Sequence, residues 1–137
     1  MRRVIVDANV FVSYLTGRHE KQYETARALL QEAEDGDLVA IVPQFVVFEV
    51  TYVLQSGYAV TGERLATMIR DLLAFPGVET IDDCPWKRVF EIWQNPLVDL
   101  ADAAIVAVAV AKRYDAVATF DRKFANRLDG FGVAAYW

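Results

Sequence analysis

Short runs of apolar, mostly β-branched residues alternate along the chain with longer segments that have helical periodicity. The runs predicted as strands cover residues 3–6, 38–42, 78–81, 116–119 and 133–136. Strands that are apolar throughout are buried on both faces, and in a parallel sheet the helical crossovers provide this cover. The alternation therefore predicts an α/β fold, with a central parallel sheet of about five strands and helices on both faces.

The segments between these runs place apolar residues at i, i+3 and i+4 spacing. They are predicted as helices over residues 8–15, 20–34, 45–55, 61–73, 86–94 and 99–112, followed by a short basic helical turn that ends at residue 128. Most aromatic side chains fall on the apolar faces of these helices and are expected in the core. The chain of 137 residues has no long linker, so we expect one domain over residues 1–137.

Composition excludes several classes of site and partner. The single cysteine, Cys84, and the single histidine, His19, rule out an internal disulfide and zinc sites built from Cys or His. A net charge of −5 argues against broad electrostatic binding of nucleic acid, but it is compatible with a local basic patch or a metal. No leader sequence is visible and no apolar run approaches the roughly 20 residues of a membrane span. We therefore expect a soluble cytoplasmic protein with no membrane partner.

Four carboxylates lie where the apolar pattern does not call for a charge. Asp7 and Asp121 directly follow predicted strands, while Glu49 and Asp102 interrupt apolar helices. Each has an ordinary structural interpretation: Asp7 and Asp121 can cap helices, Glu49 can meet a buried arginine, and Asp102 can interact with a helix dipole. Asp99 is best interpreted as the N-cap of the Ala-rich helix.

The positions of these acids favour a shared site over separate structural roles. In parallel α/β sheets the ligand site lies beyond the carboxyl ends of the strands, where Asp7 and Asp121 are expected. Several carboxylates in one pocket repel each other unless a cation binds there. Mg²⁺ and Mn²⁺ prefer hard oxygen ligands and need neither His nor Cys. The chemistry suited to such a site is metal-assisted phosphoryl transfer.

Four pieces of the sequence, taken in order, resemble a PIN domain, and within that family the VapC-type toxins of toxin–antitoxin pairs. The pieces are the Asp7-Ala8-Asn9 motif after the first strand, Glu49 in the third helix, the run 100–109 and the segment 118–124. The resemblance extends from residue 3 to about residue 136. It implies an endoribonuclease that depends on Mg²⁺ or Mn²⁺. It also implies a homodimer that is held inactive by a small antitoxin, whose tail enters the acidic pocket.

The resemblance also implies roles for individual residues. The four acids of the family are matched by Asp7, Glu49, Asp102 and Asp121, and its supporting polar residues by Asn9 and Thr119. Our hypothesis is that Asp7, Asp102 and Asp121 hold the metal directly or through water, and that Glu49 completes the acidic shell and orients the attacking water. Asn9 and Thr119 would steady Asp7 and Asp121 by hydrogen bonds. Asp99 shares a helix face with Asp102, so either could be the main third acid.

An acidic protein still needs contacts to RNA, and the basic residues near the C-terminus offer them. Arg122 and Lys123 directly follow Asp121 and could meet phosphates beside the metal, although an ordinary solvated helix face is the alternative interpretation. Three other functions stay open: an RNA-processing PIN nuclease without an antitoxin, a non-catalytic PIN module that binds a metal or a partner, and a Mg²⁺-dependent phosphatase or receiver-like phosphoacceptor. The last is disfavoured because the first strand is followed by one acid where that class needs two.

Overall fold

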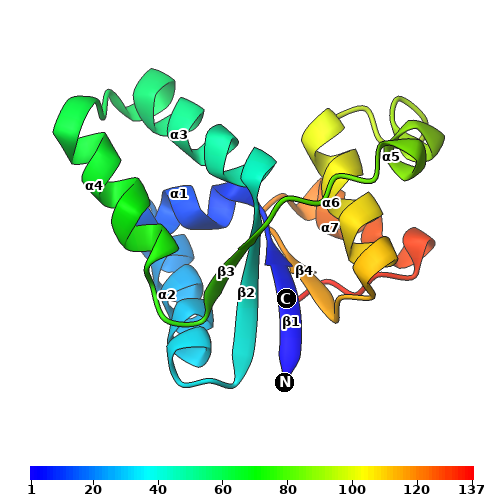
Figure 1. The fold of residues 1–137 in the computed structure, drawn as a ribbon, viewed down its shortest axis with the longest axis horizontal. Helices are drawn as coiled ribbons and strands as arrows, with labels where there is room; N and C mark the ends of the chain where they lie inside the picture. The colour runs from blue at the N-terminus through cyan, green and yellow to red at the C-terminus, as the bar shows by residue number, and fades with distance from the viewer.

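The sheet of the computed structural model, which describes residues 1–137 (Figure 1), contains four parallel strands. They are β1 (Arg2–Val6), β2 (Leu38–Pro43), β3 (Val78–Ile81) and β4 (Ala116–Ala118), in the spatial order β3-β2-β1-β4. β1 is therefore central, and its last residue, Val6, pairs with Ala118, the last residue of β4. The predicted α/β class and parallel sheet are confirmed.

The segment predicted as a fifth strand makes a single bridge to the edge of the sheet. Ala135 pairs with Val117, and the backbone N–H of Val117 donates to the carbonyl of Ala134 at 2.9 Å. The N–H of Tyr136 donates back to the carbonyl of Val117 at 2.8 Å. Because β4 has only three residues, it offers little edge for a longer ladder.

The helices follow the predicted ranges to within a few residues. They are α1 (Ala8–Thr16), α2 (Glu20–Glu34), α3 (Gln44–Tyr58), α4 (Gly62–Leu73), α5 (Trp86–Ile92), α6 (Leu100–Lys112), α7 (Arg122–Ala125) and the 3₁₀ turn η1 (Leu128–Phe131). The main difference is α3, which continues through Gly57 and ends only where Ala59 adopts a left-handed conformation with φ of 53°. No helix has the length and apolar character needed to cross a membrane.

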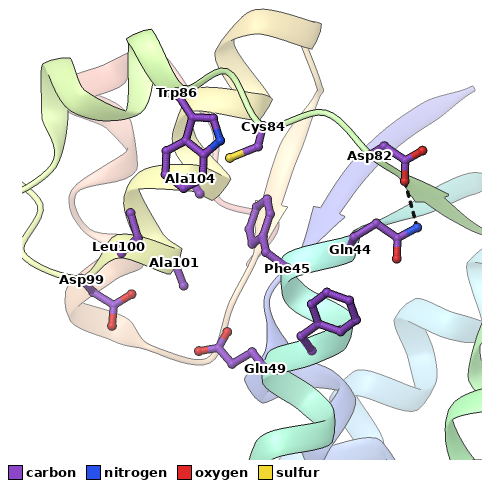
Figure 2. Close-up of a pocket in the computed structure, with 11 residues that line it drawn as sticks. Gln44, Phe45, Glu49, Asp82, Cys84, Trp86, Asp99, Leu100, Ala101 and Ala104 are labelled. Carbon is purple, nitrogen blue, oxygen red and sulfur yellow. Dashed lines mark hydrogen bonds between the residues drawn. The ribbon is translucent and has the colours of Figure 1, made fainter.

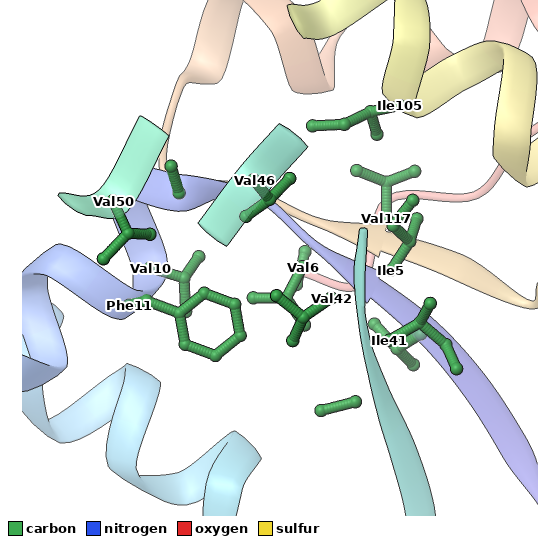
Figure 3. Close-up of a cluster of buried hydrophobic side chains, with 14 of the residues drawn as sticks. Ile5, Val6, Val10, Phe11, Ile41, Val42, Val46, Val50, Ile105 and Val117 are labelled. Atoms are coloured by element: carbon green, nitrogen blue, oxygen red, sulfur yellow. The ribbon is translucent and has the colours of Figure 1, made fainter. Parts of the chain in front are cut away.

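The helices form two layers, one on each side of the sheet (Figure 1). Helices α1 to α4 lie on one side, and α5, α6 and α7 lie on the other. Successive strand residues point to opposite layers. Figure 3 shows Val6 and Val42 beside Phe11 of α1, whereas Ile5 and Val117 lie on the side of Ile105 of α6. The resulting core has no exposed surface at these positions and holds the ends of β1 and β4 rigid.

The turn that precedes β3 packs closely against α2, and this close contact depends on a glycine. Gly77, which precedes β3, has φ of +84°, and a Cβ atom there would collide with the carbonyl oxygen of Ala33. Its own carbonyl accepts a hydrogen bond from the N–H of Ala40 in β2 at 2.8 Å. The turn cannot move away without loosening this contact to the sheet.

We therefore expect Gly77→Ala to destabilise the protein by about 3 kcal/mol or more, because left-handed strain adds to a backbone collision. Gly36→Ala is the matched control, since Gly36 has a similar φ of +83° with open space around its Cβ position. That variant should lose only about 1 kcal/mol. Urea unfolding of both variants measures the difference, and equal losses would contradict the predicted collision.

Candidate active site

Asp7 is the first residue after β1 and the N-cap of α1. Its Oδ1 accepts a hydrogen bond from the N–H of Ala8 at 2.8 Å. Its Oδ2 accepts from the hydroxyl of Thr119 at 2.8 Å and from the Asn9 amide at 3.3 Å. Only 6% of Asp7 is exposed, and burial raises the pKa of this carboxyl, although the hydrogen bonds from Thr119 and Ala8 oppose the rise.

Asn9 and Thr119 connect the ends of β1 and β4. The Asn9 amide donates to the Thr119 hydroxyl at 3.2 Å, and the Asn9 carbonyl oxygen accepts from the backbone N–H of Phe120 at 3.0 Å. The Thr119 hydroxyl also accepts from the N–H of Asp121 at 3.1 Å while it donates to Asp7. The Asp7 carboxylate therefore has a fixed orientation, and the chain leading to Asp121 is attached to the same network.

The capping interpretations of Asp99 and Asp121 are correct. Asp99 Oδ1 accepts from the N–H of Asp102 at 3.0 Å at the start of α6, and Asp121 Oδ1 accepts from the N–H of Phe124 at 3.1 Å at the start of α7. Each cap occupies one carboxylate oxygen and leaves the other without a hydrogen-bond partner in the chain. Asp99 and Asp121 can therefore cap their helices and still offer one carboxylate oxygen to a ligand.

All five of these acids line one cavity of about 350 Å³. They come from four different places in the fold: Asp7 from the end of β1, Glu49 from α3, Asp99 and Asp102 from the start of α6, and Asp121 from the end of the β4 loop. Asn9 also lines this cavity. The carboxylates surround the space without forming a closed ligand set, since no three His, Cys, Asp or Glu side chains are already placed to hold one ion.

The acids are not neutralised by basic side chains. The ion pairs of the chain join Arg3 to Glu79, Arg27 to Glu24 and Lys112 to Asp83, all outside this cavity. The interpretation that Glu49 meets a buried arginine is therefore wrong. Instead, Glu49 Oε2 is buried with no hydrogen-bond partner.

Burial and mutual repulsion make two of these acids hard to ionise. Burial, with the nearby charges of Asp7 and Asp99, raises the pKa of Glu49 to about 7. Burial, with repulsion mainly from Asp99 and Asp7, raises the pKa of Asp102 to about 7. Such a set of unpaired oxygen donors fits a hard divalent cation, which would relieve both the repulsion and the orphaned oxygen of Glu49. The residues present therefore fit Mg²⁺ or Mn²⁺.

The predicted basic contacts differ in their placement. Lys123 lines a second cavity of about 180 Å³ that shares Asp99, Asp102 and Asp121 with the acidic cavity. Arg122, its neighbour, is exposed and lines neither cavity. On a short helix these adjacent side chains point in different directions, which their spacing in the sequence does not show.

Sequence reasoning did not identify a third and larger cavity, of about 510 Å³, next to the acidic one. Figure 2 shows Phe45 of α3 facing Trp86 and Cys84 across this space, with Leu100 beside them and Glu49 and Asp99 at its edge. Phe48 also lines it and is 70% exposed, so the expectation that this aromatic is in the core is wrong. The apolar pattern of α3 does not distinguish a side chain in the core from one in a surface groove.

Residues around the α1–α2 connection also line the acidic cavity without having been predicted. They are Ser13 of α1, His19 of the connection and Gln22 of α2, together with Tyr58 at the end of α3. No motif marks them, because their proximity to Asp7 depends on how α1 and α2 pack.

The chain matches the PIN domain family over residues 4–128. No curated protein sequence matches it significantly. Three solved structures have a similar fold. The structure of VapBC2 from Rickettsia felis bound to a promoter DNA fragment is similar with a TM-score of 0.68 and 16% identity, covering 97% of this chain and 96% of that chain.

The second structure is VapC20 of Mycobacterium tuberculosis, described as a toxin that cleaves the sarcin–ricin loop, with a TM-score of 0.69 and 17% identity over 90% of this chain and 93% of that chain. The third is PAE2754 from Pyrobaculum aerophilum, with a TM-score of 0.61 and 13% identity over 96% of each chain. At these identities the likeness concerns the fold.

The raised pKa of Asp102 predicts a pH-dependent stability for the metal-free protein. The folded state holds this proton up to about pH 7, whereas an unfolded Asp loses it near pH 4, so stability falls as the pH rises between these values. Asp102→Asn removes the charge, and we expect it to be more stable than the wild type at pH 7 by about 1 kcal/mol, because partial exposure screens the repulsion. The difference should shrink toward pH 4.

Urea unfolding in the presence of a chelator, at pH 4 and at pH 7, measures this effect. Asp71→Asn, an exposed acid on α4, is the matched control and should change stability little at either pH. An Asp102→Asn variant that gains nothing at pH 7 would show that burial and repulsion do not disfavour the ionised Asp102 carboxylate in the folded protein.

Proposed function

Because the chain belongs to the PIN domain family, we propose that it is an endoribonuclease dependent on Mg²⁺ or Mn²⁺ that acts as the toxin of a toxin–antitoxin pair. The observation that carries the proposal is the gathering of five carboxylates without basic partners around one cavity, at the rigid end of the central strand. The similarity in fold to VapBC2 and to a toxin described as cleaving the sarcin–ricin loop supports RNA as the substrate and a small protein as the inhibitor.

The proposed metal ligands are Asp7, Asp102 and Asp121, directly or through water, with Glu49 completing the acidic shell. A bound Mg²⁺ or Mn²⁺ supplies a water of lowered pKa and stabilises the negative charge that develops on the phosphate. Asp102 is favoured over Asp99 as the third acid, because both of its carboxylate oxygens are free of hydrogen bonds within the chain, whereas one oxygen of Asp99 accepts from the N–H of Asp102.

The protein's own groups have distinct tasks in this proposal. The hydrogen bonds from Ala8, Asn9 and Thr119 keep the Asp7 carboxylate in one orientation, which lowers the cost of arranging the site during the reaction. Glu49, with a pKa of about 7, is suited to accept a proton from the attacking water at neutral pH. The result is hydrolysis of an RNA phosphodiester bond.

The apolar cavity beside the acids is our proposed site for part of the antitoxin. Its walls include Phe45, Trp86 and Leu100, and its edge carries Glu49 and Asp99. A peptide with both apolar and basic side chains would match this surface, and its tail could enter the acidic cavity through the shared acids. The exposed aromatic residues of α3, with Tyr52 69% exposed, are compatible with the proposed homodimer. The proposed substrate and inhibitor place the activity in the cytoplasm.

Substitution of the acids tests the reaction. Asp7→Asn and Asp102→Asn should each lower metal-dependent RNA cleavage by about 100-fold or more, because each removes a charged ligand at the centre of the site. Cleavage of a labelled single-stranded RNA with Mg²⁺ or Mn²⁺, compared with a chelator control, measures this loss. Asp71→Asn provides the surface control and should retain wild-type activity. Wild-type rates in either site variant would refute the assignment.

Growth of a bacterial host distinguishes a toxin from an RNA-processing enzyme. Expression of the wild-type chain should arrest growth, the Asp7→Asn variant should not, and co-expression of the protein encoded beside it should restore growth. RNA cleavage without growth arrest would favour the processing enzyme. A protein that binds metal but cleaves no RNA would favour the non-catalytic module.

The proposed RNA contacts of Arg122 and Lys123 predict a graded effect. Lys123→Glu should weaken RNA binding more than Arg122→Glu, because Lys123 lines the cavity beside Asp121 whereas Arg122 does not. Loss of one phosphate contact lowers the slope of log affinity against log salt by about 0.7 for single-stranded RNA. Salt titrations of RNA binding measure the slope, and an unchanged slope in the Lys123 variant would reject its role.

A further inference from the structure

Basic and acidic side chains lie around the same cavities without pairing with each other. His19 and Tyr58 line the acidic cavity, and the guanidinium of Arg18 lies over the Tyr58 ring, 5.0 Å from its centroid. On the other side, Lys123 and Arg127 line the smaller cavity that shares three acids with the first. None of these basic side chains is in an ion pair, since all three ion pairs of the chain lie elsewhere.

Neutral partners hold two of these basic groups in place. Arg18 stacks on Tyr58, an interaction that leaves the N–H groups at the edge of the guanidinium available to other acceptors. Arg127 Nη1 donates to the carbonyl of Pro96 at 2.7 Å and retains further donors. Positive charges are thus held beside the two cavities without pairing with the carboxylates that line them. A ligand that carries a cation and several anionic groups would bind both sets.

The basic side chains form two clusters, Arg18 with His19 and Lys123 with Arg127, and the clusters lie on opposite sides of the acids. Arg18 and His19 belong to the connection between α1 and α2, in one helical layer, whereas Lys123 lies in α7 and Arg127 follows it, in the other layer (Figure 1). The end of β1 with Asp7 lies between the layers. Asp99, Asp102 and Asp121 line both cavities, so the two cavities adjoin at these acids, and we call the pair the trough.

The α1–α2 side of the trough also carries a neutral donor. The hydroxyl of Ser13, which is buried, donates to Gln22 Oε1 at 2.9 Å. This contact leaves the NH₂ group of Gln22 without a partner in the chain, although the side chain lines the acidic cavity. Arg18, His19 and Gln22 together therefore provide hydrogen-bond donors on a side of the site where the acids offer only acceptors.

We propose that this donor group is a second phosphate-binding site, which holds the backbone of single-stranded RNA on the side of the scissile bond opposite Lys123 and Arg127. The inference rests on the proposed nuclease function and adds the path of the substrate. In this proposal the cleaved phosphate lies at the metal held by the acids. The phosphate on one side of it meets Arg18 and His19, and the phosphate on the other side meets Lys123 and Arg127.

Equilibrium binding of a fluorescently labelled single-stranded RNA, with a chelator present to prevent cleavage, tests this site. Arg18→Gln should weaken binding about fivefold and lower the salt slope by about 0.7, as expected for one lost phosphate contact. Arg18→Lys keeps the charge and should keep the wild-type slope. The effects of Arg18→Gln and Lys123→Gln should add on the free-energy scale, because they lie at separate ends of the trough.

Arg70→Gln is the matched control, since Arg70 is an exposed arginine on α4 outside both cavities and should leave affinity and slope unchanged. Thermal melting of each variant confirms folding. A wild-type slope in Arg18→Gln, or equal losses in Arg18→Gln and Arg18→Lys, would overturn this inference while wild-type RNA cleavage upheld the proposed function. The inference would also be overturned if Arg18→Gln weakened only the binding of an antitoxin. A wild-type protein that neither binds nor cleaves RNA would overturn both proposals.

Discussion

The hydrogen bond between the Thr119 hydroxyl and the Asp7 carboxylate depends on the register of β1 and β4, and the rest of the site depends on that bond. Val6 pairs with Ala118, so the next residues of the two strands leave the sheet side by side. The apolar core on both faces prevents a shift of register, because a slip by one residue would turn every buried side chain to the wrong layer. Asn9 then joins both strand ends, and the same network orients the chain toward Asp121.

The acidic cavity combines structural and chemical demands on the same side chains. Asp7, Asp99 and Asp121 each cap a helix with one carboxylate oxygen, so the helix starts position the acids around the cavity. Burial, together with repulsion that no basic partner relieves, raises the pKa values of Glu49 and Asp102. Without the proposed cation this arrangement of acids costs stability, which is a common compromise at functional sites.

The separation of basic from acidic side chains is compatible with the proposal that this acidic protein binds RNA. The chain has a net charge of −5, yet Lys123 and Arg127 line a cavity beside the acids, Arg18 stacks on Tyr58 of the acidic cavity, and none of the three forms an ion pair. Stacking on Tyr58 and the contact to the Pro96 carbonyl hold two of these cations away from the carboxylates. Both signs of charge therefore stay available to a ligand that carries both, which a metal-bound phosphodiester does.

The sequence by itself determined the α/β class and pointed to the four acids, because apolar runs interrupted or ended by single charges are local patterns. The two polar residues beside them, Asn9 and Thr119, came from the resemblance to the PIN family. Asp7 and Asp121 follow from strand ends, and Glu49 and Asp102 from charges inside apolar helices. The tertiary structure alone decided that Asp99 shares the cavity, that Phe48 is exposed, and that Lys123 but not Arg122 faces the acids. It also brought His19 and Gln22 to the acidic cavity and stacked Arg18 on Tyr58. These outcomes depend on how α1, α2 and α7 pack against the sheet, and packing between distant segments leaves no periodic signal in the chain.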